Sequence, residues 1–469
     1  MEFKKFIESS YNHLDYKEYQ AEGVRWCIER EKIEDGEKIE QREGTQDYCC
    51  GGIIADEMGL GKTIMMIGTI LENFKMPTLI ILPVFLIDQW YQHIYRATGH
   101  KALVYHGQIK KVLDKEMLKK IPIILTTYGT ILSDARNNRI IQEIYWQRVI
   151  CDEAHHMRNR RAQITNAVTS LNRKITWLIS GTPIQNHIND LYSLLEILKI
   201  PKNVFIKTDN LKDIMSKVLL KRTKKEVGLK LPPLQINRIT TEWSNPVEQK
   251  LSEDIHDKLS FSLLKQKPIE KGMVLAMMTF ARMICVYPPL AAKHIENIKE
   301  MGYVSKENMD GTNYSSKMNK VIETLVSRKD NGNRKIVFTT FKEEIDYLRN
   351  QLINYGIKTD FIDGRISKGQ RNAILKSDVD VLILQIKTGN EGLNLQEYSE
   401  VYFVTPNWNP KVEEQAIARC HRLGQTKKVN VFRFVMNSFD DQLKTQNIEM
   451  YSEFVQNEKK DMESSIVKE

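Results

Sequence analysis

One stretch near the start of the chain decides its fold: residues 52–63 read Gly52-Ile53-Ile54-Ala55-Asp56-Glu57-Met58-Gly59-Leu60-Gly61-Lys62-Thr63. Its first four residues form a short apolar run typical of a buried strand, and a helical pattern continues from Thr63 to about Phe74. Gly59 and Gly61 permit the tight turn that joins the two, because glycine adopts backbone angles that other residues avoid. A buried strand, a glycine turn and a helix are the repeating parts of a parallel sheet covered by helices.

The same alternation of apolar runs and helical patterns continues along the chain. Near-continuous apolar runs indicate strands that are buried on both faces, as in parallel sheets. We expect further strands at 78–82, 121–126, 148–151 and 175–179, and a second series at 335–339, 359–362, 379–384, 401–404 and 429–434. The sequence therefore predicts an α/β protein with two parallel-sheet lobes in tandem and helical insertions between them.

The predicted domains are an N-terminal lobe over 1–235, a helical insertion and linker over 236–315, and a C-terminal lobe over 316–469. The stretch 246–298 is rich in Leu, Met and Lys and reads as helical. The polar segment 305–316 reads as a mobile connection, and the charged segment 35–46 as a surface loop.

Composition limits the class of protein. The net charge of +9 favours a polyanionic partner without establishing one. No cysteine stands in a Cys-x-x-Cys pair, so we expect reduced thiols in an intracellular compartment and no structural zinc. The first residues lack the apolar core of a signal peptide, and no run approaches the roughly 18 to 20 apolar residues of a membrane span. We therefore expect a soluble protein with no membrane partner.

The glycine turn also predicts chemistry. Its N–H groups and the start of the following helix suit phosphate oxygens. Lys62 can reach the β- and γ-phosphates of a nucleotide, and the Thr63 hydroxyl can bind magnesium. The predicted ATP-binding residues of the loop are Asp56, Gly59, Leu60, Gly61, Lys62 and Thr63. Asp56 stands where the generic phosphate loop has its first glycine.

A pair of carboxylates, Asp152-Glu153, follows the strand predicted at 148–151. Beside a phosphate loop, the first carboxylate can hold magnesium and the second can orient and deprotonate the attacking water. We assign Asp152 to the metal and Glu153 to the water. An Asp-Glu pair at a strand end is by itself more often a capping or solvated feature, but its combination with the phosphate loop favours catalysis.

Two arginines lie near the end of the chain on a predicted helix, in the stretch 415–425. Arg419 and Arg422 are three residues apart and would project from one helical face. Directed at the phosphates they would act as arginine fingers. The alternative is a solvated basic face, which an isolated Arg-x-x-Arg more often forms.

With these pieces in order, the chain resembles the Swi/Snf family of helicase-like ATPases in helicase superfamily two. The resemblance runs from about Leu14 to Phe434, and no single motif decides it; the order of the whole set does. The motifs are Tyr19-Gln20 with Trp26, the phosphate loop, Leu82-Pro83 with Trp90, Thr126-Thr127-Tyr128, Asp152-Glu153-Ala154-His155, Ser180-Gly181-Thr182-Pro183-Ile184-Gln185-Asn186, Leu220-x-Arg222-Thr223-Lys224, Leu231-Pro232-Pro233, Trp408-Asn409-Pro410 and His421-Arg422-Leu423-Gly424-Gln425.

The resemblance implies two RecA-like lobes, with ATP and magnesium as cofactors. It implies that Gln20 contacts adenine and that Arg419 and Arg422 complete the ATP site from the second lobe. It also implies contacts with double-stranded DNA by Thr127, Tyr128, Gly392, Asn394 and Trp408. Asn390 and Glu391 depart from the family pattern, since an acidic group stands near a proposed phosphate path.

The resemblance implies an ATP-dependent translocase on duplex DNA, of the chromatin-remodelling or repair type, in the nucleus or at a viral site of replication or transcription. Nucleosomes or other DNA-bound proteins are its expected partners. The segment Arg282-Met283-x-Cys285 is similar to the DNA-repair and transcription-termination branch, whose RING insertion this sequence lacks. Two alternatives are a strand-separating helicase of the same superfamily and a catalytically dead DNA-binding scaffold. The motifs after residue 220 argue against the first, and intact Lys62, Asp152, Glu153 and Arg422 argue against the second.

Overall fold

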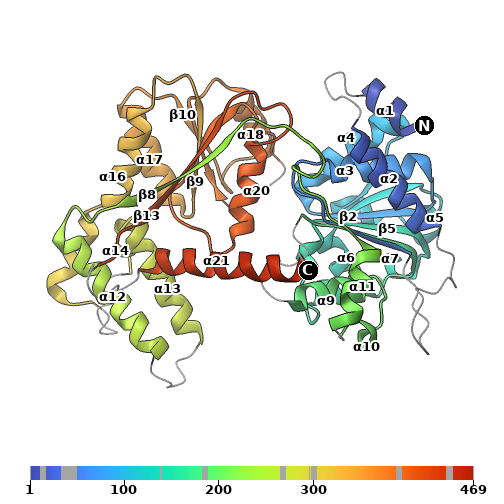
Figure 1. Ribbon diagram of the computed structural model, residues 1–469, viewed down its shortest axis with the longest axis horizontal. Helices are drawn as coiled ribbons and strands as arrows, with labels where there is room; N and C mark the ends of the chain where they lie inside the picture. Colours follow the sequence, from blue (N-terminus) through green and yellow to red (C-terminus); the bar gives the residue numbers. More distant parts are fainter. Residues whose placement is uncertain are drawn as a thin grey trace. The chain divides into compact units, whose positions relative to one another are not determined.

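The computed structural model describes residues 2–10, 17–32, 50–137, 140–181, 188–206, 208–264, 271–294, 296, 304–386, 393–439 and 447–467. The chain divides into two compact units, Met1–Lys230 (unit 1) and Leu231–Glu469 (unit 2), each built on its own sheet (Figure 1). The finer three-part division at 235 and 315 stays a prediction. The charged segment 35–46 lies outside the described residues.

Unit 1 contains a seven-stranded sheet in the order β3-β4-β2-β5-β6-β1-β7, in which every pairing is parallel. Strands near all five predicted positions are present, which confirms the parallel-sheet lobe. The sequence reading missed the two edge strands, β3 and β7, because both are too short to show an apolar run. The strands are β1 (Gly51–Ile54), β2 (Thr78–Leu82), β3 (Leu103–Tyr105), β4 (Ile123–Thr127), β5 (Trp146–Asp152), β6 (Arg173–Ile179) and β7 (Leu219–Leu220).

Helices cover both faces of this sheet (Figure 1). On one face α1–α4 pack on alternate strand residues such as Ile80, Leu82 and Trp177, which gives one continuous apolar core. On the other face lie α6, α9 and α11. The longer helices of unit 1 are α1 (Glu2–Ser10), α2 (Glu18–Glu31), α3 (Lys62–Glu72), α4 (Ile87–Thr98), α6 (Tyr128–Arg136), α8 (Gln163–Thr169), α9 (Ile188–Ile197) and α11 (Thr208–Val218).

Unit 2 contains a six-stranded parallel sheet in the order β10-β11-β9-β12-β13-β8. The edge strand β8 was not among the strands predicted from the sequence. Its alternation is weak because Leu234 and Ile236 remain exposed at the sheet edge. The strands are β8 (Leu234–Thr241), β9 (Arg334–Thr339), β10 (Thr359–Ile362), β11 (Val381–Gln385), β12 (Tyr398–Phe403) and β13 (Val429–Met436).

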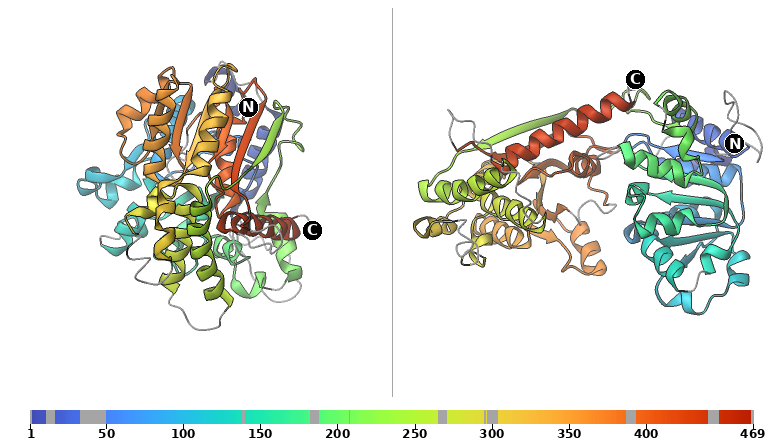
Figure 2. Two further views of the ribbon diagram at one scale, coloured as in Figure 1. Left: turned by 90° about the vertical axis from the view of Figure 1, so that its left-hand side faces the viewer. Right: turned by 90° about the horizontal axis from the view of Figure 1, so that it is seen from below.

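Two helix layers and a separate helical cluster complete unit 2. One apolar core joins α18 and α20 to the sheet, and another joins α16 and α17 to its opposite face. The helices α12 and α13 lie side by side beyond the sheet and share a third core with α21 (Figure 2). The bounds are α12 (Pro246–Leu264), α13 (Lys271–Val286), α14 (Pro289–Ala292), α16 (Ser316–Ser327), α17 (Lys342–Asn354), α18 (Lys368–Lys376), α20 (Pro410–Cys420) and α21 (Ile448–Val467).

The polar segment that we expected to be a mobile connection is packed against α12. Its residues form the 3-10 helix η4 (Lys306–Asn313), and the Ser305 N–H donates to Asp254 Oδ2 at 3.0 Å. Gly311 approaches the helix so closely that a Cβ there would lie 2.7 Å from the Cβ of Leu251. The prediction of a mobile connection, which rested on the polarity of the segment, is therefore wrong. Polar groups of the segment form hydrogen bonds with α12. Across the described parts of the chain, no helix is long and apolar enough to cross a membrane.

Candidate functional site

The glycine turn between β1 and α3 has the backbone that its sequence predicts. Gly59 and Gly61 have φ angles of 93° and 85°, in the left-handed region that favours glycine. A Cβ at Gly61 would lie 2.4 Å from Nε2 of Gln20, and that amide donates to the Leu60 carbonyl oxygen at 3.0 Å. The α2 residue predicted to contact adenine is therefore placed directly against the loop.

Lys62 begins α3, and its side chain folds back over the loop. Its ammonium donates to the carbonyl oxygens of Asp56 at 2.7 Å and Glu57 at 3.5 Å. A Cβ at Gly181, just beyond β6, would lie 3.5 Å from the same nitrogen. The loop thus holds a cation beside the carboxyl ends of β1 and β6, with Thr63 the next residue of the helix.

Asp56, which replaces the expected glycine, is fully buried and paired with Arg222. The guanidinium donates to both carboxylate oxygens, at 2.6 and 3.2 Å, and a third N–H reaches the Tyr19 carbonyl oxygen at 2.6 Å. The next residue is held in the same way, because the Lys224 ammonium lies 3.1 Å from the Glu57 carboxylate. We infer that Asp56 positions the loop through Arg222, and its direct contact with ATP stays a prediction.

Replacing Arg222 by methionine should lower the free energy of unfolding of unit 1 by about 3 kcal/mol, because it leaves a buried carboxylate unpaired. Asp56→Asn in the same chain removes that charge and should recover most of the loss. Urea unfolding followed by tryptophan fluorescence measures this, and the exposed neighbour Lys225→Met is the matched control. A loss no larger than that of the control would show that the pair does not stabilise the loop.

Asp152 ends β5, and its carboxylate is held by two N–H groups. Trp90 donates its indole N–H to Oδ2 at 2.7 Å, and the Glu153 N–H donates to Oδ1 at 2.9 Å. Burial, and then the Glu153 charge, raise the pKa of Asp152, while the hydrogen bond from Trp90 and the charge of Lys62 act in the opposite direction. A carboxylate whose charge is disfavoured by burial gains from a bound divalent cation. Thr63, the residue after Lys62, offers a hydroxyl oxygen as well. These oxygen ligands fit magnesium, which prefers oxygen.

Glu153 has a strained backbone, with φ 52° and ψ 49° in the left-handed region. Such angles are uncommon outside glycine and gather at functional sites. Its carboxylate lies 3.2 Å from Nδ1 of His155, whose ring stacks on His156 at 4.9 Å. The two carboxylates therefore have different partners, Trp90 for Asp152 and His155 for Glu153, and their separate catalytic roles stay a prediction.

Thr127 and Tyr128, predicted to contact DNA, have buried side chains. Thr127 caps α6 by accepting the Thr130 N–H at 3.1 Å, and the Tyr128 hydroxyl donates to the Asp152 carbonyl oxygen at 2.7 Å. Burial raises the pKa of Tyr128 well above its ordinary value. Both side chains support the site from inside unit 1, and a DNA contact through them stays a prediction.

In unit 2 the helix carrying the two arginines is shorter than predicted. Helix α20 ends at Cys420, so Arg419 lies in its last turn and Arg422 beyond it; the expectation of one shared helical face is wrong. Burial, and then the charge of Arg419, lower the pKa of Arg422, so the two guanidiniums interact electrostatically. Among the residues that the structure describes, the Arg422 guanidinium has no carboxylate partner.

The turn that carries Arg422 is held by its neighbours in the same motif. Gln425 donates its amide to the carbonyl oxygens of Gln396 at 2.8 Å and Tyr398 at 3.0 Å. A ring nitrogen of His421 lies 2.8 Å from the Pro232 carbonyl oxygen. Motif order identified His421, Gln425, Trp90 and Arg222 as family residues but predicted no role for them.

The remaining predicted DNA contacts have different surroundings. Asn394 is exposed, and the neighbouring Leu395 N–H donates to the Arg419 carbonyl oxygen at 3.2 Å. Trp408 is half-buried, with the Arg282 guanidinium 5.9 Å from its ring centre. Gly392 lies outside the described residues, together with 387–391 and residues 182–186 of the Ser180 motif.

Comparison with known proteins identifies the family. Residues 19–290 match the SNF2-related domain, and residues 316–424 match the helicase conserved C-terminal domain. The first match alone covers more than half of the chain. The chain belongs to the SNF2-related family of helicase-like ATPases.

The SNF2-related chain is similar to much longer proteins. Chromodomain-helicase-DNA-binding protein 8 of Danio rerio is 29% identical over 493 residues, which cover 94% of this chain and 19% of that protein. The human protein 8 is 29% identical, covering 92% of this chain and 18% of that protein, and human protein 6 is 28% identical, covering 92% and 17%. The chain thus spans about a fifth of the length of these relatives. A solved structure, the Sulfolobus solfataricus SWI2/SNF2 ATPase core in complex with dsDNA, matches with 23% identity and a TM-score of 0.41, covering 96% of this chain and 95% of that one.

Proposed function

We propose that this SNF2-related chain is an ATP-driven translocase on double-stranded DNA that displaces or remodels DNA-bound proteins. The nucleus, or a viral site of replication or transcription, is its proposed location, and nucleosomes are among its proposed targets. One observation carries the proposal: Lys62, whose ammonium folds back over the phosphate loop, and the buried Asp152 at the end of β5 interact within unit 1, so that the Lys62 charge favours the ionised carboxylate. Family membership and the names of the relatives, which contain helicase and DNA-binding, support DNA as the partner.

In this proposal the residues of unit 1 hold and activate ATP. Lys62 and the loop N–H groups bind the phosphates, and Gln20 contacts adenine. Thr63 and Asp152 would hold magnesium, which supplies positive charge to the phosphates when bound. Glu153 accepts a proton from the attacking water. Its left-handed backbone fixes the direction of the carboxylate and thereby the position of that water.

Unit 2 contributes charge in this proposal. Arg422 and Arg419 neutralise negative charge that develops on the transferred phosphoryl group. The lowered pKa of Arg422 supports this, since a half-buried guanidinium beside a like charge gains from an anionic partner.

ATP hydrolysis measured with no nucleic acid, single-stranded DNA, duplex DNA and RNA tests the function. We expect duplex DNA to give the largest stimulation, because the family motifs and the +9 charge favour a polyanionic duplex. Stimulation by single strands with strand separation would favour the helicase alternative, and absence of any turnover would favour the scaffold.

DNA affinity should also fall steeply between low and moderate salt, because phosphate contacts release counterions. A salt-independent affinity would contradict a motor that follows the DNA backbone.

A further inference from the structure

Residues 405–408 of unit 2 lie between β12, which ends at Phe403, and α20, which begins at Pro410, and we name them the β12–α20 connection. Other elements hold its first two residues by specific contacts. The Thr405 hydroxyl donates to Glu449 Oε1 of α21 at 2.7 Å. The Pro406 carbonyl oxygen accepts from the Arg282 guanidinium of α13 at 3.3 Å.

The next two residues of the connection are also held by α21. The buried Gln456 amide donates to the Asn407 carbonyl oxygen and, at 2.9 Å, to Glu413 Oε1 of α20. The same Glu413 oxygen accepts the Asn407 N–H at 2.8 Å. One turn further along α21, the Lys459 ammonium donates to the Trp408 carbonyl oxygen at 3.0 Å. Every residue of the connection therefore has a contact with α13 or α21.

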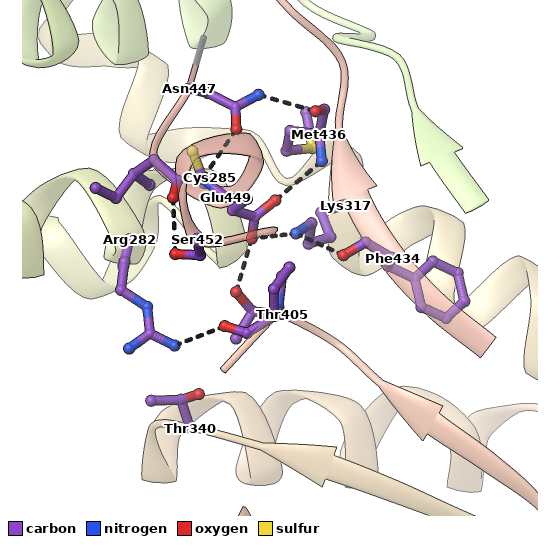
Figure 3. A network of polar contacts seen from close by, with 12 residues as sticks. Arg282, Cys285, Lys317, Thr340, Thr405, Phe434, Met436, Asn447, Glu449 and Ser452 are labelled. Carbon is purple, nitrogen blue, oxygen red and sulfur yellow. Dashed lines mark hydrogen bonds and ion pairs between the residues drawn. The ribbon is translucent and has the colours of Figure 1, made fainter. Parts of the chain in front are cut away.

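Helix α21 is itself anchored firmly at its start. Glu449, 1% exposed, pairs with the buried Lys317 of α16, and its second oxygen accepts the Met436 N–H at 2.9 Å (Figure 3). The Asn447 side chain caps the helix by accepting the Glu449 N–H at 3.0 Å and donates to the Met436 carbonyl oxygen at 2.8 Å. Because a buried ion pair is costly to break, this end of α21 is a fixed support from which the side chains further along the helix reach the connection.

The connection sets where α20 begins, and α20 leads to the two arginines. Its 11 residues end at Cys420, next to Arg419 and two residues before Arg422. A helix of that length is about 16 Å long, so a tilt of a few degrees at its start moves its far end by on the order of 1 Å. A displacement of that size in a reacting group can lower a rate by about 10²-fold.

We propose that α21 is a positioning element for ATP hydrolysis, in which Gln456 and Lys459 hold the β12–α20 connection and thereby place Arg419 and Arg422. This inference rests on the proposed function, since it gives the arginines a catalytic task. Neither α21 residue lies in the ATP-binding unit, so both act on the rate through the arginines and not on the binding of nucleotide.

The test compares the full chain with the double variant Gln456→Leu/Lys459→Met, which removes both donors and keeps their apolar bulk. We expect DNA-stimulated kcat to fall by about 10- to 100-fold, with the affinity for a fluorescent ATP analogue unchanged. Lys459→Arg retains a donor and should restore most of the Lys459 contribution. The matched control is Asn457→Ala/Glu458→Ala, two exposed residues between them on the same helix, which should leave kcat unchanged.

Two further measurements distinguish a loss of positioning from a loss of folding: urea unfolding of each variant, and kcat of the single variant Lys459→Met. If the double variant is unfolded, Lys459→Met decides, because Lys459 is partly exposed and its loss leaves no buried cavity. A folded variant with wild-type kcat would overturn the inference, as would equal losses for Lys459→Arg and Lys459→Met. The absence of DNA-stimulated hydrolysis in the unaltered chain would instead contradict the proposed function.

Discussion

Replacing Arg422 by alanine should lower DNA-stimulated ATP hydrolysis by about 10³- to 10⁵-fold, the usual contribution of an arginine finger, and leave ATP binding largely intact. The guanidinium would act only on charge that develops in the transition state, so its loss should appear in kcat and not in nucleotide affinity. Steady-state hydrolysis with saturating duplex DNA, together with equilibrium binding of a fluorescent ATP analogue, measures both quantities.

Two further variants sharpen this prediction. Arg419→Ala should behave similarly, because its charge lies close enough to shift the pKa of Arg422. Lys427→Ala removes an exposed cation that donates to the Gly332 carbonyl oxygen at 2.7 Å, and it should change turnover by a few-fold at most, as surface charges do. If Arg422→Ala changed turnover as little as Lys427→Ala, the two arginines would be a solvated basic face and unit 2 would not complete the ATP site.

The second large effect is expected at Glu153. Glu153→Gln removes the carboxylate that accepts the proton of water, and we expect hydrolysis to fall by about 10²- to 10⁴-fold. Lys62, Thr63 and Asp152 remain, so magnesium-dependent binding of ATP should persist. Single-turnover hydrolysis and nucleotide binding of the same preparation measure the two steps separately.

Lys62→Ala provides the contrasting variant. It removes the cation that the loop holds beside the carboxyl ends of β1 and β6, so it should weaken nucleotide binding itself. Normal turnover by Glu153→Gln would place water activation on another residue. Loss of binding by that variant would show that Glu153 holds the nucleotide or its metal.

Much of the fold could be predicted from short windows of sequence. The apolar runs of β2 and β6 indicated buried strands, and Gly59 and Gly61 indicated the left-handed turn between β1 and α3. The edge strands β7 and β8 could not be predicted in this way. Their pairing is with β1 and β13, which lie far from them in the sequence. The side chains of β7 are half-buried and most of those of β8 are exposed, so neither strand shows a buried apolar run.

Part of the candidate site could also be predicted from the sequence. Motif order indicated Lys62, Asp152 and Glu153 as members of one site, because strand ends of a parallel sheet meet at one edge. It also placed Arg419 and Arg422 near each other, although it extended α20 beyond its end at Cys420.

By itself the sequence determined the family, the two parallel-sheet units and the phosphate loop, because turn chemistry and apolar periodicity act over a few neighbouring residues. Only the tertiary structure decided which distant groups hold that machinery. Asp56 meets Arg222 across 166 positions, and Trp90 meets Asp152 across 62. Gln456 reaches the β12–α20 connection only through the packing of α21. Such pairs depend on the order of strands in each sheet and on which helices cover it, and no local pattern encodes either.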